Sequence, residues 1–413
     1  MKFLFIHQNF PGQFKHLAPT LAARGHEVRA LGVTGSPSPG VALTNYQLQK
    51  GNTPSIHPFA QEFETKVIRA EACAREMLKL KKSGFEPDLV VGHPGWGETL
   101  FSKEIFPQAK LLNYLEFHYG KDKGDTYFDP EFQQPNLVHD MRLRVKNANN
   151  FLALDAMDAG LCPTQWQRSV LPACYQDKVK VIFDGIDTDL VCPNDQAVVA
   201  LQTQAGQNIQ LAAGQEILTF ICRNLEPYRG YHSLMRALPE ILKARPHAQV
   251  VIVGGNQTSY GSSAPQGQTW QEIFLSEVKE KLGTDLARVH FIGKVPYATF
   301  VKIIQITRVH LYLTYPFVLS WSCIEAMSAG ALIVGSDTPP VTEFITHGHN
   351  GLLVDFFDYK QIAETVIEAL ARPEQYLALK TQARKTIVEQ YDLKRICLPQ
   401  QLALVEGLAT GSN

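Results

Sequence analysis

The sequence predicts an α/β protein made of two Rossmann-like, doubly wound domains that face each other across a cleft. Short apolar segments recur along the chain, and apolar residues at helical spacing follow several of them. This alternation is typical of βαβ units, which form parallel sheets with helices on both faces. The alternation stops over residues 193–215, which are rich in Gln, Asn and Ala, and then restarts. A length of 413 residues is compatible with two such domains.

The first domain is expected over residues 1–192. A helix is predicted after its first strand, because Phe14, Leu17, Ala18 and Leu21 recur at helical spacing. The predicted strands are KFLFIH (2–7), EVRALGV (27–33), PDLVVGH (87–93), AKLLNYLEFH (109–118) and DKVKVIFDGID (177–187).

The second domain is expected over residues 193–393, with residues 193–215 as the connection into it. A closing helix is predicted over 394–413. The predicted strands are ILTFIC (217–222), AQVVIVGG (248–255), VHFIG (289–293), VHLYLTY (309–315), ALIVGS (331–336) and GLLVD (351–355).

Composition and charge exclude several classes of protein. A hydrophobic content of 45% and a charged content of 19% are ordinary for a globular protein. The formal net charge of −1 offers no global attraction for nucleic acid. The seven cysteines are scattered without a CxxC pair, which predicts neither a disulfide framework nor a zinc site.

The chain is expected in the cytoplasm, because we find neither a signal peptide nor a membrane-spanning segment. The basic segment REMLKLKK (75–82) is typical of a solvated helix face. Its alternative role is contact with anionic lipid at the inner membrane face.

Two arginines flank the loop after the first strand of the second domain. Arg223 follows that strand and Arg229 precedes a helix. Guanidinium groups pair bidentately with phosphate oxygens, so the two side chains suit a diphosphate. The alternative is that both are surface arginines on a loop.

A second candidate site lies in the segment YPFVLSWSCIEAMSAG (315–330). Ser322 and Glu325 have the spacing of a capping box, which would make Glu325 a helix-capping residue. The same helix start, from Ser320 through Trp321 to Ser322, offers backbone N–H groups to an anion. In that case Glu325 accepts hydrogen bonds from two neighbouring hydroxyls, such as those of a ribose.

Further polar residues follow other predicted strands. Glu343 is either a ligand contact or part of a surface turn. In the first domain, Gly12 is either a turn glycine or a position where the backbone approaches a ligand. The remaining candidates end strands or lie in the loops after them, where a structural role is the alternative: Glu116 and His118 after one strand, and His93 and Trp96 after another.

Taken together, these segments resemble the retaining glycosyltransferases of family 4, which have the GT-B fold. The resemblance spans nearly the whole chain. It is carried by HQNFPGQF (7–14), VKVIFDGIDTDLVCPN (179–194), YRGYHSLMRAL (228–238), CIEAMSAGALIVGSD (323–337) and EFITHGHNGLLV (343–354).

The resemblance implies a metal-independent transfer of a hexose-type sugar from a nucleotide-sugar donor, most commonly a UDP-sugar, to a hydroxyl acceptor. It implies that Arg223 and Arg229 hold the donor diphosphate and that Glu325 binds the ribose. His118 corresponds to a histidine beside the reacting sugar, and Gly12 to a glycine loop near the donor phosphate. His93, Trp96 and Glu116 are then candidates for binding the acceptor.

The chain departs from the family pattern at one position. The first glutamate of the two-glutamate motif is replaced by Phe317, seven residues being interposed before Glu325. We expect Glu343, or the backbone amides near Leu319 and Ser320, to substitute in positioning the donor sugar. Two alternatives share the fold: a nucleotide-sugar 2-epimerase, and a nucleotide-sugar-binding protein that has lost catalysis. The acceptor, the donor base and the oligomeric state are open at this stage.

Overall fold

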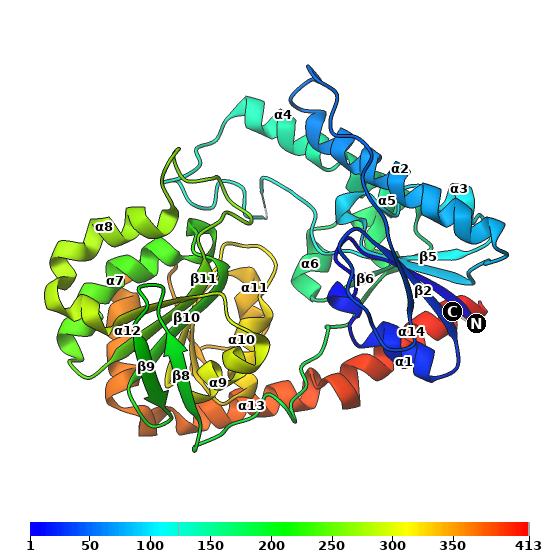
Figure 1. Cartoon of the computed structure of the whole chain (residues 1–413). Coiled ribbons are helices and arrows are strands. Elements are labelled where there is room, and N and C mark those ends of the chain that lie inside the picture. Colours follow the sequence, from blue (N-terminus) through cyan, green and yellow to red (C-terminus); the bar gives the residue numbers. More distant parts are fainter. Residues whose placement is uncertain (123, 412–413) are drawn as a thin grey trace. The chain divides into compact units, whose positions relative to one another are not determined.

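The computed structural model describes residues 1–122 and 124–411, which form two compact units (Figure 1). Unit 1 contains residues 1–185 and the returning chain from Leu393, whereas unit 2 contains Ile186–Asp392. The sequence placed the boundary at 192/193. In the structure the boundary falls earlier, between residues 185 and 186, because residues 186–192 bond to unit 2. The carbonyl of Val191 accepts a hydrogen bond from the Ser328 hydroxyl, and that of Cys192 accepts one from the Gln305 amide.

The sheet of unit 1 has seven parallel strands in the order β3-β2-β1-β4-β5-β6-β7. The order reverses between β1 and β4. Two short strands, β3 and β6, were not predicted. The strands are β1 (Lys2–Ile6), β2 (Glu27–Gly32), β3 (Ala42–Asn45), β4 (Leu89–Gly92), β5 (Lys110–Tyr114), β6 (Ala159–Cys162) and β7 (Val179–Val181).

Helices cover both faces of this sheet (Figure 1). Alternate residues of β1 separate the two cores: Phe3 and Phe5 pack with α1 (Leu17–Ala23) and α14 (Leu398–Thr410), whereas Leu4 and Ile6 pack with α2 (Gln61–Lys82). The other helices of unit 1 are α3 (Ser102–Ile105), α4 (Leu137–Lys146), α5 (Ala148–Ala156) and α6 (Gln165–Ser169). Residues 393–411 therefore complete the core of unit 1.

The sheet of unit 2 has six parallel strands in the order β12-β11-β10-β13-β14-β15, with the reversal between β10 and β13. All six were predicted from buried apolar segments. The strands are β10 (Ile217–Asn224), β11 (Gln249–Gly255), β12 (Val289–Gly293), β13 (Val309–Tyr312), β14 (Leu332–Ser336) and β15 (Leu352–Val354). The doubly wound α/β fold class is thus confirmed.

Helices again lie on both faces. Helices α7 (Tyr231–Ala244), α8 (Trp270–Leu282) and α12 (Tyr359–Ala371) pack with one another, as do α9 (Tyr297–Ile306), α10 (Trp321–Ser328) and α13 (Leu377–Gln390) (Figure 1). A short helix, α11 (Pro339–Thr342), follows β14.

The segment 193–215 is more than a connection, which corrects the expectation from sequence. It contains an antiparallel hairpin of β8 (Val198–Gln202) and β9 (Asn208–Ala212). Val199, Leu201 and Leu211 are buried, while the alternating positions face solvent. This weak period-2 pattern was hidden by the many polar residues around it.

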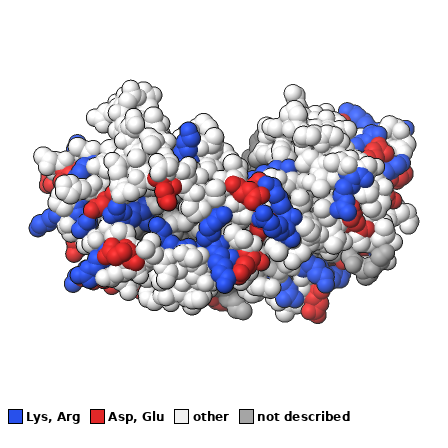
Figure 2. Space-filling model, turned by 90° about the horizontal axis from the view of Figure 1, so that it is seen from below, with Lys and Arg blue, Asp and Glu red and all other residues white. Residues whose placement is uncertain are grey.

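None of the helices over residues 1–122 and 124–411 combines the length and apolar character needed for a bilayer span. On the face shown in Figure 2, basic and acidic side chains are interspersed, in keeping with the net charge of −1.

Candidate active site

The ends of β10 and β13 adjoin where the strand order of unit 2 reverses, and ligands of doubly wound sheets bind beyond the carboxyl ends at such a point. A 3₁₀ turn, Pro227–Arg229, and α7 follow β10, whereas α10 follows β13 after a short loop. The two connections touch at Gly230. Its φ is +71°, and a Cβ there would lie 2.3 Å from the Cβ of Leu313. Only glycine fits this approach.

Arg229 is turned into the protein rather than out into solvent. Its side chain is buried, and Nη1 donates to Thr314 Oγ1 at 2.8 Å and to the carbonyl of Val318 at 2.9 Å. The guanidinium carbon lies 5.0 Å from the ring centre of Tyr260 and 5.8 Å from that of Phe317. Arg229 thus fixes the loop that connects β13 to α10. Its role in holding a diphosphate stays a prediction.

Phe317, at the position of the absent first glutamate, lies in a buried aromatic cluster. Its ring centre is 5.1 Å from that of Tyr228 and 4.9 Å from that of Tyr260, and Tyr228 also packs against Tyr315 at 4.7 Å. Phe317 is only 5% exposed. A packed ring therefore stands where the resemblance places a carboxylate.

A buried carboxylate holds Tyr260 in place. The side chain of Glu226 is fully buried and accepts backbone N–H bonds from Ser259, Tyr260 and Gly261 at 3.2–3.3 Å. Burial raises the pKa of Glu226, while these three N–H groups act in the opposite direction. The loop after β11 is thereby tied to the turn after β10. Sequence analysis missed both Glu226 and Tyr260, because they lie in different loops.

Arg223 differs from Arg229 in being exposed at the end of β10. Within residues 1–122 and 124–411 its side chain makes no hydrogen bond or ion pair. Its guanidinium is therefore available to an anion at the carboxyl edge of the sheet.

The capping box predicted from Ser322 is wrong. Helix α10 begins at Trp321, and its N-cap is Ser320, whose hydroxyl accepts the N–H of Ser322 at 3.3 Å. The Ser320 N–H donates to the hydroxyl of Tyr312 at 2.7 Å. Because the helix starts two residues earlier than the box requires, Glu325 lies beyond the first turn.

Glu325 is buried, and its Oε1 accepts a hydrogen bond from the hydroxyl of Tyr297 at 2.7 Å. Burial and the Glu325 carboxylate raise the pKa of Tyr297. Tyr297 fixes the orientation of this carboxylate, and it was not identified from the sequence. The neighbouring Leu319 is buried and Trp321 is half-buried.

Glu343 is half-buried and ends the short helix α11, which follows β14 at the same edge of the sheet. The ends of β13 and β14 are joined there, because the Ser336 hydroxyl accepts the N–H of Thr314 at 3.1 Å. Glu343 thus belongs to the predicted edge, and its contact with a donor stays a prediction.

In unit 1, the three predicted acceptor residues lie together at the carboxyl edge of the sheet. The ring of His93 stacks on Trp96 with centres 4.3 Å apart, and His93 Nε2 lies 3.4 Å from Glu116 Oε2. His93 also caps the turn Pro94–Trp96, since its Nδ1 accepts the N–H of Gly95 at 3.1 Å.

His118 lines a cavity of about 70 Å³ together with His93, Tyr114, Glu116 and Asn150. Its Nδ1 is buried and has no hydrogen-bond partner among the residues that the structure describes. Burial lowers the pKa of His118, so the imidazole is neutral at pH 7. A neutral, unpartnered imidazole in a cavity can bind a substrate hydroxyl.

The group that lies against the backbone of Gly12 is the ring of His7, a residue that sequence analysis did not single out. Gly12 has φ +49°, and a Cβ there would lie 2.3 Å from the His7 ring. His7 Nδ1 accepts the N–H of Asn9 at 3.0 Å, and Nε2 bonds to Gln13 Oε1 at 2.8 Å. Glycine at this position is therefore explained by the histidine that follows β1.

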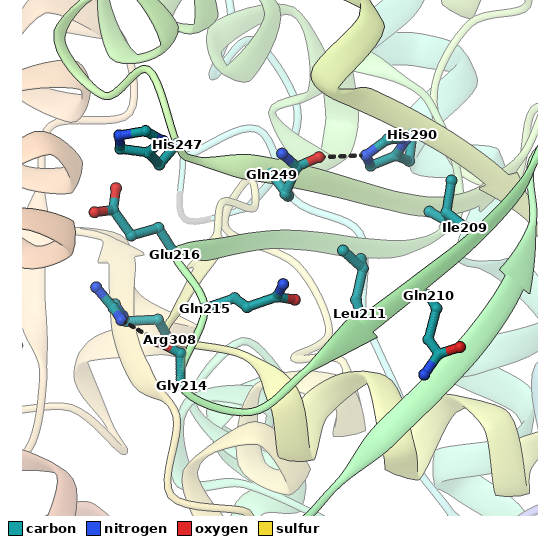
Figure 3. A pocket seen from close by; sticks show the side chains of 10 residues that line it. All are labelled: Ile209, Gln210, Leu211, Gly214, Gln215, Glu216, His247, Gln249, His290 and Arg308. Carbon is teal, nitrogen blue, oxygen red and sulfur yellow. Dashed lines mark hydrogen bonds between the residues drawn. The ribbon is translucent and has the colours of Figure 1, made fainter.

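A larger cavity, of about 740 Å³, opens at the opposite, amino-terminal edge of the unit 2 sheet. Gln249 and His290 from β11 and β12 form a hydrogen bond of 2.7 Å in its wall, and Arg308 bonds to the Gly214 carbonyl (Figure 3). None of the residues predicted to bind the donor lines it.

Comparison with known proteins gives two family matches that together span most of the chain. Residues 24–191 match the glycosyl transferase family 4 group, and residues 203–386 match the glycosyl transferases group 1. Spore coat protein SA of Bacillus subtilis is 24% identical over 336 residues, covering 77% of this chain and 78% of that protein. D-inositol 3-phosphate glycosyltransferase of Corynebacterium efficiens is 26% identical over 197 residues, covering 47% of this chain and 43% of that protein.

Solved structures show the same fold at low identity. Sucrose-phosphate synthase from Thermosynechococcus elongatus has a TM-score of 0.73 at 20% identity, with both chains covered in full. Anabaena Alr3699/HepE in complex with UDP-glucose has a TM-score of 0.65 at 16% identity, covering 99% of this chain and 100% of that chain. With two parallel α/β sheets, each carrying polar residues at its switch point, the chain is a GT-B enzyme and belongs to the group 1 glycosyltransferases of family 4.

Proposed function

We propose that this glycosyltransferase moves a hexose from a UDP-sugar to a hydroxyl acceptor, with retention and without a metal ion. The observation that carries the proposal is the pair of polar groups at the switch point of unit 2. Arg223 offers an unengaged guanidinium at the end of β10, and Glu325 offers a carboxylate oriented by Tyr297 in the helix that follows β13. The UDP and UDP-glucose held by structural neighbours support a donor of this class.

In this proposal the bond between the anomeric carbon and the diphosphate oxygen breaks, and its electron pair leaves with UDP. The acceptor hydroxyl bonds to the same face of the sugar, and its proton passes to the leaving phosphate oxygen. Arg223 stabilises the charge that develops on that oxygen, a form of electrostatic catalysis. Glu325 binds the ribose hydroxyls, which positions the donor without entering the reaction.

Unit 1 supplies the acceptor side. His93, Trp96 and Glu116 give an aromatic surface and a carboxylate for binding a polar acceptor, and the neutral His118 accepts or donates a hydrogen bond to a sugar hydroxyl. Phe317 stands where the resemblance places a carboxylate that recognises the donor sugar, so another group must take over that recognition. We assign that recognition to Glu343 or to the backbone amide of Leu319, because the Ser320 N–H is already bonded to the Tyr312 hydroxyl.

A donor screen by thermal unfolding tests the proposal. UDP should raise Tm more than GDP or ADP does, since a ligand at 100 times its Kd stabilises the folded state by about 2.7 kcal/mol. Glu325→Ala should abolish the shift, and Glu240→Ala, an exposed position on α7, should leave it intact.

A second assay follows the UDP-sugar that gives the larger shift. We expect UDP release that depends on a hydroxyl acceptor. Interconversion of the donor without any acceptor would identify an epimerase instead, and the absence of a shift with every nucleoside diphosphate would refute the proposed donor class.

A further inference from the structure

We propose that the solvent face of α4 docks unit 1 onto an anionic lipid surface. Leu137 is 73% exposed, Val138 57% and Met141 45%, and all three lie on one side of this helix. Apolar side chains at positions i, i+1 and i+4 form a continuous stripe. The inference concerns unit 1 alone and goes beyond the proposed reaction.

The exposed stripe belongs to a well-anchored helix rather than to a frayed end. Asn136 caps α4, its side chain accepting the N–H of Val138 at 2.8 Å. On the opposite side of the helix, Leu143 is buried. The helix is therefore held with its apolar stripe toward solvent, and exposed apolar side chains in such a stripe mark an interaction surface.

The charges beside the stripe are complementary to anionic headgroups. Arg142 and Arg144 are exposed on α4. The helix's single carboxylate, Asp140, is half-buried and accepts a hydrogen bond from the Tyr127 hydroxyl at 2.7 Å. Among the residues that the structure describes, Arg142 pairs with Glu62 at 3.4 Å, through two side chains that are 57% and 41% exposed. Such an exposed pair is worth little and gives way to a lipid phosphate.

The basic segment 75–82, considered for this role from the sequence, is less suitable. Its helix, α2, exposes one large apolar side chain, Leu78 at 45%, whereas α4 exposes three beside its two arginines. Helix α4 therefore combines more apolar exposure with its cations.

A lipid surface fits this helix better than a second copy of the chain. In a two-fold symmetric dimer the same face meets itself, so Arg142 and Arg144 would approach like charges. One stripe of three side chains also falls well short of the roughly 800 Å² that each partner buries in a stable interface.

Helix α5 begins directly after α4 and lines the His118 cavity with Asn150 and Leu154. Phe151 and Leu152 are 43% and 45% exposed, and the Phe151 ring is 5.2 Å from that of His118. The helix that follows the proposed lipid-docking helix therefore borders the cavity proposed to receive the acceptor.

Vesicle co-sedimentation of the full chain tests the inference, using phosphatidylcholine with and without about a third phosphatidylglycerol. Two variants are compared with the parent, L137S/V138S/M141S and R142E/R144E. Each should lower the partition onto anionic vesicles at least about tenfold, by loss of apolar insertion or of headgroup attraction. The matched control is L190S/L377S, which removes two leucines of unit 2 that are 53% and 57% exposed.

Circular dichroism melting verifies that all variants fold. Binding to anionic vesicles that both α4 variants lose and the control keeps supports the inference. It is overturned by the absence of anionic binding in the parent or by equal binding in all variants. It is also overturned by a dimer that L137S/V138S/M141S dissociates in analytical ultracentrifugation without any vesicle binding. Because no donor is present, the outcome is separate from that of the proposed reaction.

Discussion

The guanidinium carbon of Arg229 lies 5.8 Å from the ring centre of Phe317. Phe317 is the position at which the chain departs from the glycosyltransferase pattern, because it stands where the resemblance places the first glutamate. Tyr260 contacts both, its ring centre lying 5.0 Å from the guanidinium carbon and 4.9 Å from the Phe317 ring centre. Arg229, Tyr260 and Phe317 thus form one packed unit.

This coupling predicts non-additive mutants. Arg229→Lys should cost about 1–3 kcal/mol in unfolding free energy, because lysine cannot keep the bonds to Thr314 and Val318 in the same geometry. In F317E/R229K the new carboxylate gives that lysine a partner. The double mutant should therefore lose less unfolding free energy than the two single mutants lose together, by at least about 0.5 kcal/mol. Urea unfolding of the parent, R229K, F317E and the double mutant measures the coupling. The control F317L/R229K offers no new partner and should be additive, and additivity in F317E/R229K would contradict the coupling.

A second prediction concerns the carboxylate under the loop after β11. Glu226→Gln replaces one acceptor oxygen by an NH₂ group facing the backbone N–H groups of residues 259–261. We expect a loss of about 1–3 kcal/mol and faster hydrogen exchange at those amides. The exposed Glu240→Gln is the control. Exchange at 259–261 that is equal in both variants would show that Glu226 does not hold the loop.

A third prediction separates catalysis from stability at Arg223. Arg223→Ala should lower turnover at least tenfold, about 1.4 kcal/mol of barrier. Its Tm should stay within experimental error, because the side chain is exposed and makes no contact that folding requires. Arg372→Ala, an exposed arginine at the end of α12, is the matched control. Full turnover in R223A with a verified donor would remove Arg223 from the site.

A fourth prediction concerns acid. His7 is 3% exposed, and burial, with the nearby His93, lowers its pKa from 6.5 to about 4. The unfolded chain therefore binds this proton more readily than the folded protein. The stability contribution is complete above pH 6.5 and is lost as the pH falls toward 4. A shift of this size corresponds to roughly 3 kcal/mol.

Urea unfolding of His7→Gln at pH 7 and at pH 4.5 checks this sign. The variant should show a smaller loss of stability between the two pH values than the parent. Some loss should remain, because burial also lowers the pKa of His310, in unit 2, to about 4. An identical loss in both proteins would mean that His7 is protonated without cost in the folded state.

The sequence was informative where burial is local and continuous. Strands such as β10 and β14 are short apolar segments, and the number of strands in the parallel sheet of unit 2 was correct. It was uninformative where one residue type stands at two candidate positions. Ser320 and Ser322 are both capable of capping α10, and only the backbone places the N-cap at Ser320.

Contacts between distant loops were also beyond sequence analysis. Glu226 and Tyr260 are joined across 34 positions, and nothing in the pattern of either loop indicates the other. His7 was overlooked because its packing against Gly12 depends on a left-handed backbone that no motif specified.

The return of residues 393–411 to unit 1 has a consequence for biosynthesis. The core of unit 1 includes Leu402, Leu404 and Val405 from α14, which follows unit 2 in the sequence. Residues 1–185 consequently lack part of their core until α14 has been translated, whereas unit 2 can fold before then. During synthesis, the apolar surface of unit 1 that α14 covers stays exposed to solvent. A premature stop at codon 393 would leave this surface exposed permanently.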